Sequence, residues 1–419
     1  MKFTAVLKNS DWKMSFFTIW IGQAISLVSS ELVQFALIWW LIEKSGSATI
    51  LAVATMITLL PSAILSPFLG ALVDRWNRRY VMIIADSTIA LSLISLFYFS
   101  NSENIQIWQV FLIMLIRAIG GAIHMPAMLA STSLMVPKEH LGRIAGINQM
   151  LNGIIMVIVP PLGALLLGSI SFNGIIGIEI VGAFVGIVPL LFIIIPQPEK
   201  ELIAKKTQSI WRDVLEGFKY INQWKGAVGM LVISTMVNFI MRPAFQLLGI
   251  VVVNQFGGDE IQFGWMAAAL GAGFLSGGFV LSMWGGFKRK MQTSLIGIFG
   301  AGLSILLFGL VPQISLYLGF VCIFLAGFMM PLCMGPIQAL IQSSVDPSIQ
   351  GRVFTIIKSA STLISPLSLL IAGPVFDKFG PLTWYIWGGV VAIIISVIGY
   401  MNPIILNLGA PGKSKLKEI

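Results

Sequence analysis

The chain has 419 residues, of which 57% are hydrophobic and only 10% are charged. Soluble globular proteins usually carry about 25% charged residues, so this composition excludes a soluble protein and predicts one that resides in a lipid bilayer. The formal net charge of +9 would suit a nucleic-acid partner, but the placement of the basic residues points elsewhere.

Apolar runs of about 20 residues recur along the whole chain, and each is long enough to cross a hydrocarbon core of about 30 Å as an α-helix. The sequence lacks the strand alternation of a membrane barrel. We therefore predict an all-α integral membrane protein with twelve transmembrane helices. The predicted spans are 14–42, 48–73, 80–100, 106–130, 145–168, 173–196, 226–253, 262–284, 291–311, 314–335, 353–374 and 382–404.

Lysine and arginine are distributed unevenly between the predicted loops. With a cytoplasmic N-terminus, only Lys44 and Lys378 fall on the outer side, and the basic residues within spans are Arg117, Arg242 and Lys358. The others lie on the cytoplasmic side, as the positive-inside rule requires. The sequence thus predicts that both termini are cytoplasmic. The excess of positive charge is explained by the membrane topology and does not indicate a nucleic-acid partner.

The first span carries a carboxylate deep in an apolar run, in the stretch LVSSELVQFALIWWLIEK. A charge near the centre of a membrane helix costs roughly 2.5–3.5 kcal/mol on insertion scales, so Glu31 is expected to have a functional or structural role. Helical spacing puts Gln23, Ser30 and Gln34 on one polar face, with Glu31 at its edge. We predict that Glu31 exchanges protons; the alternative is a permanent salt bridge to an arginine of another span.

The loop after the second span reads GALVDRWNRRYVM. Asp74 ends a helix whose C-terminal dipole disfavours an anion, so it needs a partner: Arg78, or the N-terminus of a helix in the other half. The alternative is that the arginines only anchor the topology. The residues predicted to form a conformational gate here are Gly70, Asp74, Arg75, Arg78 and Arg79.

Spans three, four and six carry further ionisable groups. We predict that Arg117, near mid-depth, takes part in proton coupling with Glu31. His124 lies two turns further along the same face, where a lone histidine more often bonds a neighbouring carbonyl than relays protons. Asp86 and Glu179 lie within about two turns of a membrane surface, so a shallow structural role is favoured for Asp86, and the same caution applies to Glu179.

Span seven repeats the polar spacing of the first span, with Ser234 followed by three polar residues at intervals of four. Two polar stripes on equivalent helices should face a common cavity. Cys322 and Cys333 are three turns apart, beyond disulfide reach, and are predicted to be packing residues. No cluster of metal ligands or cofactor motif is present. The predicted substrate-cavity residues are Gln23, Ser30, Gln34, Asn152, Asn238, Arg242 and Gln246.

The two halves of the chain echo one another. HMPAMLASTSLMVPKEHLGRI (124–144) is matched by MGPIQALIQSSVDPSIQGRV (334–353), and VPPLGALLLG (159–168) by ISPLSLLIAG (364–373). Such repeats are typical of secondary transporters, whose substrate site lies at the repeat interface. We therefore predict two pseudo-symmetric six-helix bundles, 1–196 and 226–408, joined by an amphipathic cytoplasmic linker, 197–225, and followed by a tail, 409–419.

At this point the residues resemble a known family. GALVDRWNRR is similar to the loop motif G-x-L-x-D-R-x-G-R-R of the major facilitator superfamily, with Asn77 where Gly is usual. RAIGGA (117–122) resembles its span-four motif, and GIIMVIVPPLGALL (153–166) resembles its span-five antiporter motif in weakened form. The resemblance covers all twelve spans and extends to the macrolide-efflux, drug:proton antiporter branch. It implies that Asp74 holds the halves together opposite Gly351 and Arg352.

The resemblance implies proton-coupled efflux of amphiphilic drugs by alternating access, with macrolide-type antibiotics as substrates and antibiotic resistance as the consequence. Export of an endogenous metabolite such as a siderophore is the alternative. No nucleophile, phosphate loop or metal site supports an enzyme. The expected partners are a small amphiphilic substrate, protons and the lipid bilayer, and we expect a monomer in the bacterial cell (inner or plasma) membrane.

Overall fold

The computed structural model describes residues 11–101, 105–196, 227–311, 315–344 and 364–408, without the side chains of several of them, 66–75 included. These residues are helical nearly throughout, and no strand occurs among them. The helices are α1 (Asp11–Ser45), α2 (Ala48–Arg75), α3 (Arg78–Asn101), α4 (Ile107–Met135), the 3-10 turn η1 (Lys138–His140), α5 (Leu141–Ser169), α6 (Phe172–Phe192), α9 (Ala227–Gln246), α10 (Leu248–Phe256), α11 (Glu260–Trp284), α12 (Lys290–Leu310), α13 (Leu316–Ser344), α15 (Leu382–Met401) and α16 (Pro403–Leu406).

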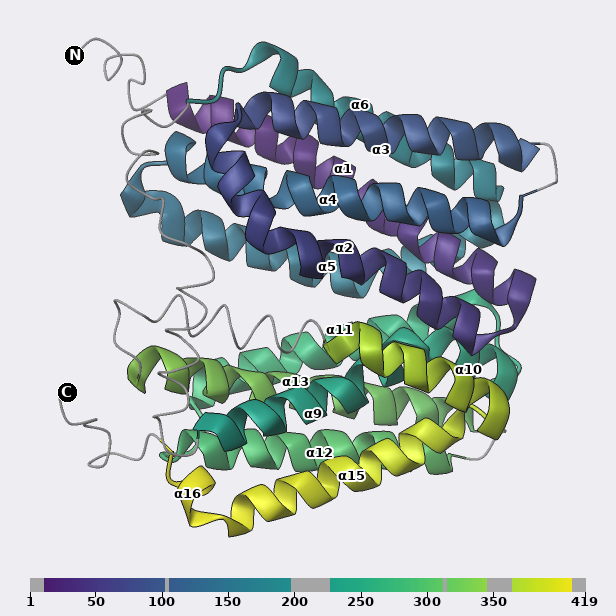
Figure 1. The fold of residues 1–419 in the computed structure, drawn as a ribbon, viewed down its shortest axis with the longest axis vertical. Helices are drawn as coiled ribbons and strands as arrows, with labels where there is room; N and C mark the ends of the chain where they lie inside the picture. Colours follow the sequence, from purple (N-terminus) through teal and green to yellow (C-terminus); the bar gives the residue numbers. More distant parts are fainter. Residues whose placement is uncertain (1–10, 102–104, 197–226, 312–314, 345–363, 409–419) are drawn as a thin grey trace. The chain divides into compact units, whose positions relative to one another are not determined.

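The described residues contain 11 helices that are long and apolar enough to cross a membrane. They correspond to eleven of the twelve predicted spans. The remaining span, predicted at 353–374, begins outside the described residues, and its described part, from 364 onward, is helical. The all-α, multi-pass architecture predicted from the sequence is therefore confirmed (Figure 1).

The chain divides into two compact units. Unit 1 comprises Met1–Leu41 and Ile57–Thr207, and unit 2 comprises Ile42–Met56 and Gln208–Ile419. The linker helix predicted at 197–225 and the tail predicted at 409–419 lie outside the described residues, so both stay predictions.

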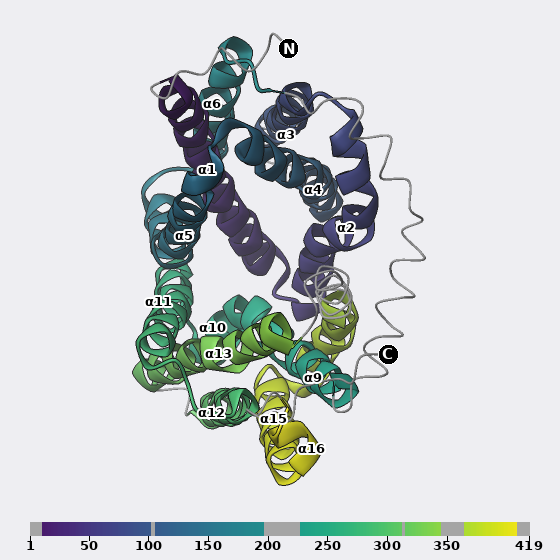
Figure 2. The ribbon, with the colours of Figure 1, turned by 90° about the vertical axis from the view of Figure 1, so that its left-hand side faces the viewer.

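In unit 1, α3 packs against α4 and α6 (Figures 1 and 2). Fully buried apolar side chains from α1, α3 and α6 meet at one end of the unit, among them Phe16, Met82 and Leu190. Helix α1 approaches α6 through small residues: a Cβ on Gly182 would lie 2.0 Å from the Ser29 hydroxyl oxygen. Small residues allow such close approach of membrane helices. Part of the polar side of α1 is therefore a helix–helix contact.

In unit 2, α12 packs against α13 and α15, and α13 also packs against α11 (Figure 2). The contact of α11 with α13 depends on glycine, because a Cβ on Gly277 would lie 2.0 Å from the carbonyl oxygen of Phe328. Hydroxyl groups add bonds between helices: Ser396 donates to the carbonyl of Leu295 at 2.7 Å. Both cysteines of α13 are free and buried, as the sequence predicted.

The seventh span, expected as one helix over 226–253, is instead two helices, α9 and α10, that meet at Leu247. Pro243 lies four residues before the junction, where its missing N–H and its ring weaken the helical ladder. Backbone close to the junction is also bonded from α15, because the Tyr385 hydroxyl donates to the carbonyl of Ala244. Broken membrane helices persist when neighbours satisfy the backbone in this way.

Candidate functional site

A buried ion pair joins α4 to α6 within unit 1. Arg117 Nη1 contacts Glu179 Oε2, and the two side chains are only 8% and 2% exposed. Arg117 Nη2 also donates to the carbonyl oxygen of Ser30 at 2.9 Å and to its hydroxyl oxygen at 3.0 Å. The sequence suggested a shallow position for Glu179, but the fold makes it the buried counterion of Arg117. A pair so far from water must be held by this set of contacts.

Glu31 follows Ser30 in α1, and its side chain is exposed where Glu179 is buried. It interacts electrostatically with both Arg117 and Glu179. The alternative of a permanent Glu31–Arg117 salt bridge does not describe this structure, because the described ion pair of Arg117 is made with Glu179. One cation therefore stands beside two carboxylates, and the cluster is neutral only when one carboxylate carries a proton. A charge excess in such a place is costly.

A second polar cluster lies in the same unit. Asp86 of α3 is buried, with Oδ1 3.4 Å from Nε2 of His124 in α4. Its other oxygen, Oδ2, accepts a hydrogen bond from Gln23 Nε2 at 3.1 Å. Gln23 Nε2 also donates to the carbonyl of Gly186 in α6 at 3.1 Å. The sequence favoured a shallow position for Asp86, but its carboxylate is buried and contacts Gln23 of α1 and His124 of α4.

The loop arginines bind backbone carbonyls inside unit 1. Arg78 is buried, and its Nη1 donates to the carbonyl of Ala130 at 3.0 Å. Arg79 donates from Nε and Nη2 to the carbonyls of Leu190 and Leu191 at the end of α6. Cations are favourable there because the helix dipole is negative at its C-terminus. The side chains of Asp74 and Arg75 and the whole of Gly351 and Arg352 lie outside the described set, and Gly70 is described only as a backbone position of α2. The predicted gate therefore stays a prediction.

The other predicted cavity residues lie on three helices, α1, α5 and α9. Gln34 of α1 and Gln246 of α9 are half-buried. Asn152 of α5 is exposed and donates to Gln149 at 3.4 Å, and Asn238 of α9 donates to the Ser234 carbonyl at 2.9 Å. Arg242 is exposed, and within the described ranges no carboxylate lies in ion-pair distance of it. Both N–H groups of the Gln23 amide are engaged inside unit 1, so substrate contact there would require exchange of those bonds.

The start of α2 is capped by a carboxylate that the sequence reasoning did not single out. Asp377 accepts hydrogen bonds from the N–H groups of Ala48 at 2.8 Å and Thr49 at 3.0 Å, and from the Ser47 hydroxyl at 2.8 Å. Burial would raise the pKa of Asp377, but these hydrogen bonds together lower it below its ordinary value. An anion at a helix N-terminus is favourable because it satisfies unpaired N–H groups.

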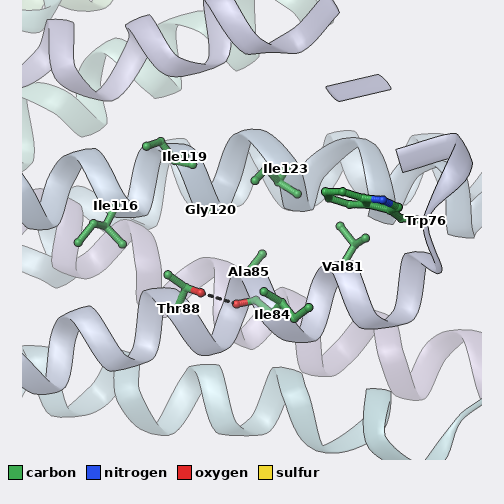
Figure 3. Close-up of a pocket in the computed structure, with 9 residues that line it drawn as sticks. All are labelled: Trp76, Val81, Ile84, Ala85, Thr88, Ile116, Ile119, Gly120 and Ile123. Atoms are coloured by element: carbon green, nitrogen blue, oxygen red, sulfur yellow. Dashed lines mark hydrogen bonds between the residues drawn. The ribbon is translucent and has the colours of Figure 1, made fainter. Parts of the chain in front are cut away.

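An apolar groove of about 290 Å³ runs between α3 and α4 (Figure 3). Its one hydroxyl, on Thr88, donates to the carbonyl of Ile84 at 2.8 Å and is therefore engaged in its own helix. Small-molecule sites usually add a few polar groups that orient the ligand, so this groove is a weaker candidate than the charged clusters. The groove is lined by Trp76, Val81, Ile84, Ala85, Thr88, Ile116, Ile119, Gly120 and Ile123.

Long apolar helices, a broken seventh span and ionisable groups buried between helices are the features of a multi-pass membrane transporter. Residues 19–368 match the family model described as Major Facilitator Superfamily. The chain belongs to that family.

Curated relatives with similar sequences are named as transporters. Macrolide efflux protein A of Streptococcus pyogenes is 32% identical over 395 residues, which cover 93% of this chain and 96% of the relative. Macrolide efflux protein A of Enterococcus faecalis is 31% identical over 328 residues, or 77% and 100%. Enterobactin exporter EntS of Shigella flexneri is 25% identical over 286 residues, or 68% and 66%.

Solved structures share the fold at low sequence identity. A POT family transporter in complex with a thioalcohol-conjugated peptide matches with a TM-score of 0.70 at 16% identity, covering 91% of this chain and 94% of that one. The nucleoside transporter NupG matches with a TM-score of 0.62 at 14% identity, covering 90% and 97%. These likenesses concern the fold alone.

Proposed function

We propose that this protein exports amphiphilic compounds, macrolide-type antibiotics among them, in exchange for protons by alternating access. The main support is the similarity to two proteins named Macrolide efflux protein A, which extends over most of this chain. The second support is chemical: unit 1 places two carboxylates beside one arginine within the membrane-spanning region. Such a cluster suits the uptake and release of one proton.

Within this cluster, we assign the proton-carrying role to Glu31. Glu179 is held as the counterion of Arg117, and its side chain is almost completely buried. Glu31 is the more exposed of the two carboxylates. Protonation of Glu31 neutralises the cluster, and its deprotonation restores an uncompensated charge; a conformational change can be coupled to that difference.

Proteoliposomes that carry the parent protein or Glu31→Gln test this role. The glutamine keeps the size and hydrogen bonding of the side chain but cannot carry a proton. We expect the variant to fold and to bind a macrolide, to lose at least about tenfold in gradient-driven export, and to lose the matching proton release. Glu43→Gln, a change at an exposed carboxylate of the same helix, is the matched control and should export like the parent.

Full proton-driven export by Glu31→Gln would refute the role of Glu31. Loss of export in Glu179→Gln together with loss of folded protein would be consistent with a counterion role for Glu179. Proton release that survives Glu31→Gln but disappears in a folded Glu179→Gln variant would move the proton to Glu179.

Export of an anionic metabolite such as a siderophore is the second candidate. It is favoured by the similarity to the enterobactin exporter and by the exposed guanidinium of Arg242. A susceptibility panel in a host without its own pumps separates the two. Macrolide resistance that survives Arg242→Gln supports the first proposal, and siderophore export that Arg242→Gln abolishes supports the second.

We further propose that the loop after α2 acts as a conformational gate through Asp74. Asp74→Asn keeps the size of the side chain but removes its charge, so we expect normal expression with impaired switching between inward- and outward-open states. Unchanged export would mean that the loop arginines serve only as structural anchors. The contacts of Arg78 and Arg79 with backbone carbonyls already support such an anchoring role. Labels at Lys44 and Lys288 should react from opposite sides of the membrane and so test the proposed topology.

A further inference from the structure

Unit 1 contains a titratable pair that the mechanism above leaves unused. Asp86 and His124 approach to 3.4 Å between α3 and α4, and Gln23 of α1 joins Asp86 to the Gly186 carbonyl of α6. Asp86 is almost fully enclosed, with 8% of its side chain exposed, whereas His124 retains 17%. The His124 ring is thus partly exposed, whereas its Nε2 atom, which faces Asp86, is buried and makes no hydrogen bond that satisfies it among the described residues.

On three helices, the residues around this pair lie seven positions from residues of the Arg117 cluster. His124 follows Arg117 by seven residues in α4, and Gly186 follows Glu179 by seven in α6. On α1, which crosses in the opposite sense to α4 and α6, Gln23 precedes Ser30 by seven residues. Seven residues are about two turns, or roughly 10 Å along a helix. The same helix faces thus carry two polar clusters in series, and the charge pattern predicts that the His124 end is nearer the cytoplasm.

The surroundings of Asp86 leave the histidine as its charge partner. Helix α1 presents the neutral amide of Gln23, and α6 presents the Gly186 carbonyl. Among the residues that the structure describes, no lysine or arginine forms an ion pair with Asp86. Further along these helices, Arg79 lies seven residues before Asp86 in α3 and is bonded to carbonyls at the end of α6. In the other direction the next ionisable groups are Arg117, Glu179 and Glu31. The negative charge of an ionised Asp86 is compensated when the imidazole of His124 is protonated. This charge compensation favours the binding of a proton by the pair.

We propose that Asp86 and His124 form a second proton-binding station on the cytoplasmic side of the Arg117 cluster. The inference rests on the proposed proton coupling. A proton that leaves Glu31 when the protein opens inward is taken up at Nε2 of His124, with Asp86 as the counterion. The imidazole then releases the same proton to the cytoplasm and returns to its neutral form, so no further reactant is required.

The chain holds only two histidines, which makes the test selective. His140, the other one, stacks on Trp12 with ring centroids 5.3 Å apart and is 39% exposed. In the full-length His140→Gln protein in lipid nanodiscs, all histidine ring signals of a 15N NMR spectrum come from His124. We expect these signals to report uptake of a proton at Nε2 as the pH is lowered, and their response to pH to differ between the parent and Asp86→Asn, which removes the counterion.

Export measured in proteoliposomes over the same pH range supplies the functional readout. His124→Gln should shift the pH profile of export and slow proton release at least about threefold, while His140→Gln should match the parent. Ring signals that do not change from pH 5 to 9, or identical pH profiles for His124→Gln and His140→Gln, would overturn the station. Absence of proton release in the parent would instead refute the proposed coupling, and the NMR titration would still decide whether the pair binds a proton.

Discussion

Unit 1 and unit 2 place their membrane arginines in opposite surroundings. Arg117 is buried and contacts Glu179 and Ser30, whereas Arg242 is exposed and has no ion pair within the described residues. Unit 1 also buries Asp86 beside His124. Unit 2 holds its helices together by close approach at glycines and by hydroxyl bonds to carbonyls, as at Gly277 and Ser396.

Under the proposed mechanism, this difference gives the two units different tasks. Charges buried in pairs are costly to separate, so those of unit 1 are suited to hold and move a proton at a fixed place. An exposed guanidinium has no such constraint and remains available to a ligand. The tight, mainly apolar contacts of unit 2 are suited to keep its helices together as one body while α9 and α10 preserve a break.

The largest expected effect is loss of the arginine in unit 1. Arg117→Gln leaves Glu179 buried without its counterion, which should cost about 3–5 kcal/mol of stability and most of the folded yield. Arg242→Gln, the matched change in unit 2, should alter stability by less than about 0.5 kcal/mol because the side chain is exposed. Thermal unfolding in detergent compares the two, and equal losses would remove the contrast between the units.

The next effect concerns the glycine contact in unit 2. Gly277→Ala would place a Cβ 2.0 Å from the Phe328 carbonyl oxygen, so α11 and α13 must separate, at a cost of about 1–3 kcal/mol. Gly278→Ala is the control on the same helix, where the nearest atom is Pro331 Cγ at 4.0 Å. The difference in unfolding temperature measures this contact. A similar temperature for both variants would show that the contact is looser than the structure indicates.

A smaller loss is expected at the break between α9 and α10. Tyr385→Phe removes the hydroxyl that bonds the Ala244 carbonyl and should cost about 1 kcal/mol. Tyr400→Phe, on the exposed end of the same helix, loses only a 3.4 Å contact with Gln292 and should be nearly neutral. Unfolding of the two variants under identical conditions provides the comparison, and a neutral Tyr385→Phe would mean that the break needs no support from α15.

The smallest effect is expected at the start of α2. Asp377→Asn weakens the cap that serves Ala48 and Thr49, at a cost of about 0.5 kcal/mol, the low end for caps, because Asp377 is exposed. The pKa of Asp377 is lowered in the folded protein from an ordinary value of 3.8, so its contribution is present above that pH and is lost as the pH falls through the folded value. The stability difference between parent and variant should therefore be constant from pH 5 to 7 and shrink below about pH 4. A difference that grows on acidification would contradict the cap.

The sequence by itself determined the all-α, multi-pass architecture, eleven of the span positions and the packing role of the cysteines. These features depend on local quantities, namely the length and apolarity of each run and the spacing between residues on one helix. The sequence also identified Glu31 and Arg117 as candidates, because a charged side chain inside a long apolar run is energetically costly and can be recognised without a structure.

Only the tertiary structure decided which charges meet. Glu179 lies 62 residues from Arg117 along the chain, and Asp377 lies 330 residues from Ser47. Such partners depend on which helices are neighbours and how each is rotated about its axis, and a pattern within one helix does not specify this. For the same reason Asp86 was expected at a shallow position, although it is buried against Gln23 of α1 and His124 of α4. The division of the seventh span also required the structure, because Pro243 permits a kink, while the hydrogen bonds of Trp384 and Tyr385 to backbone carbonyls stabilise the broken helix.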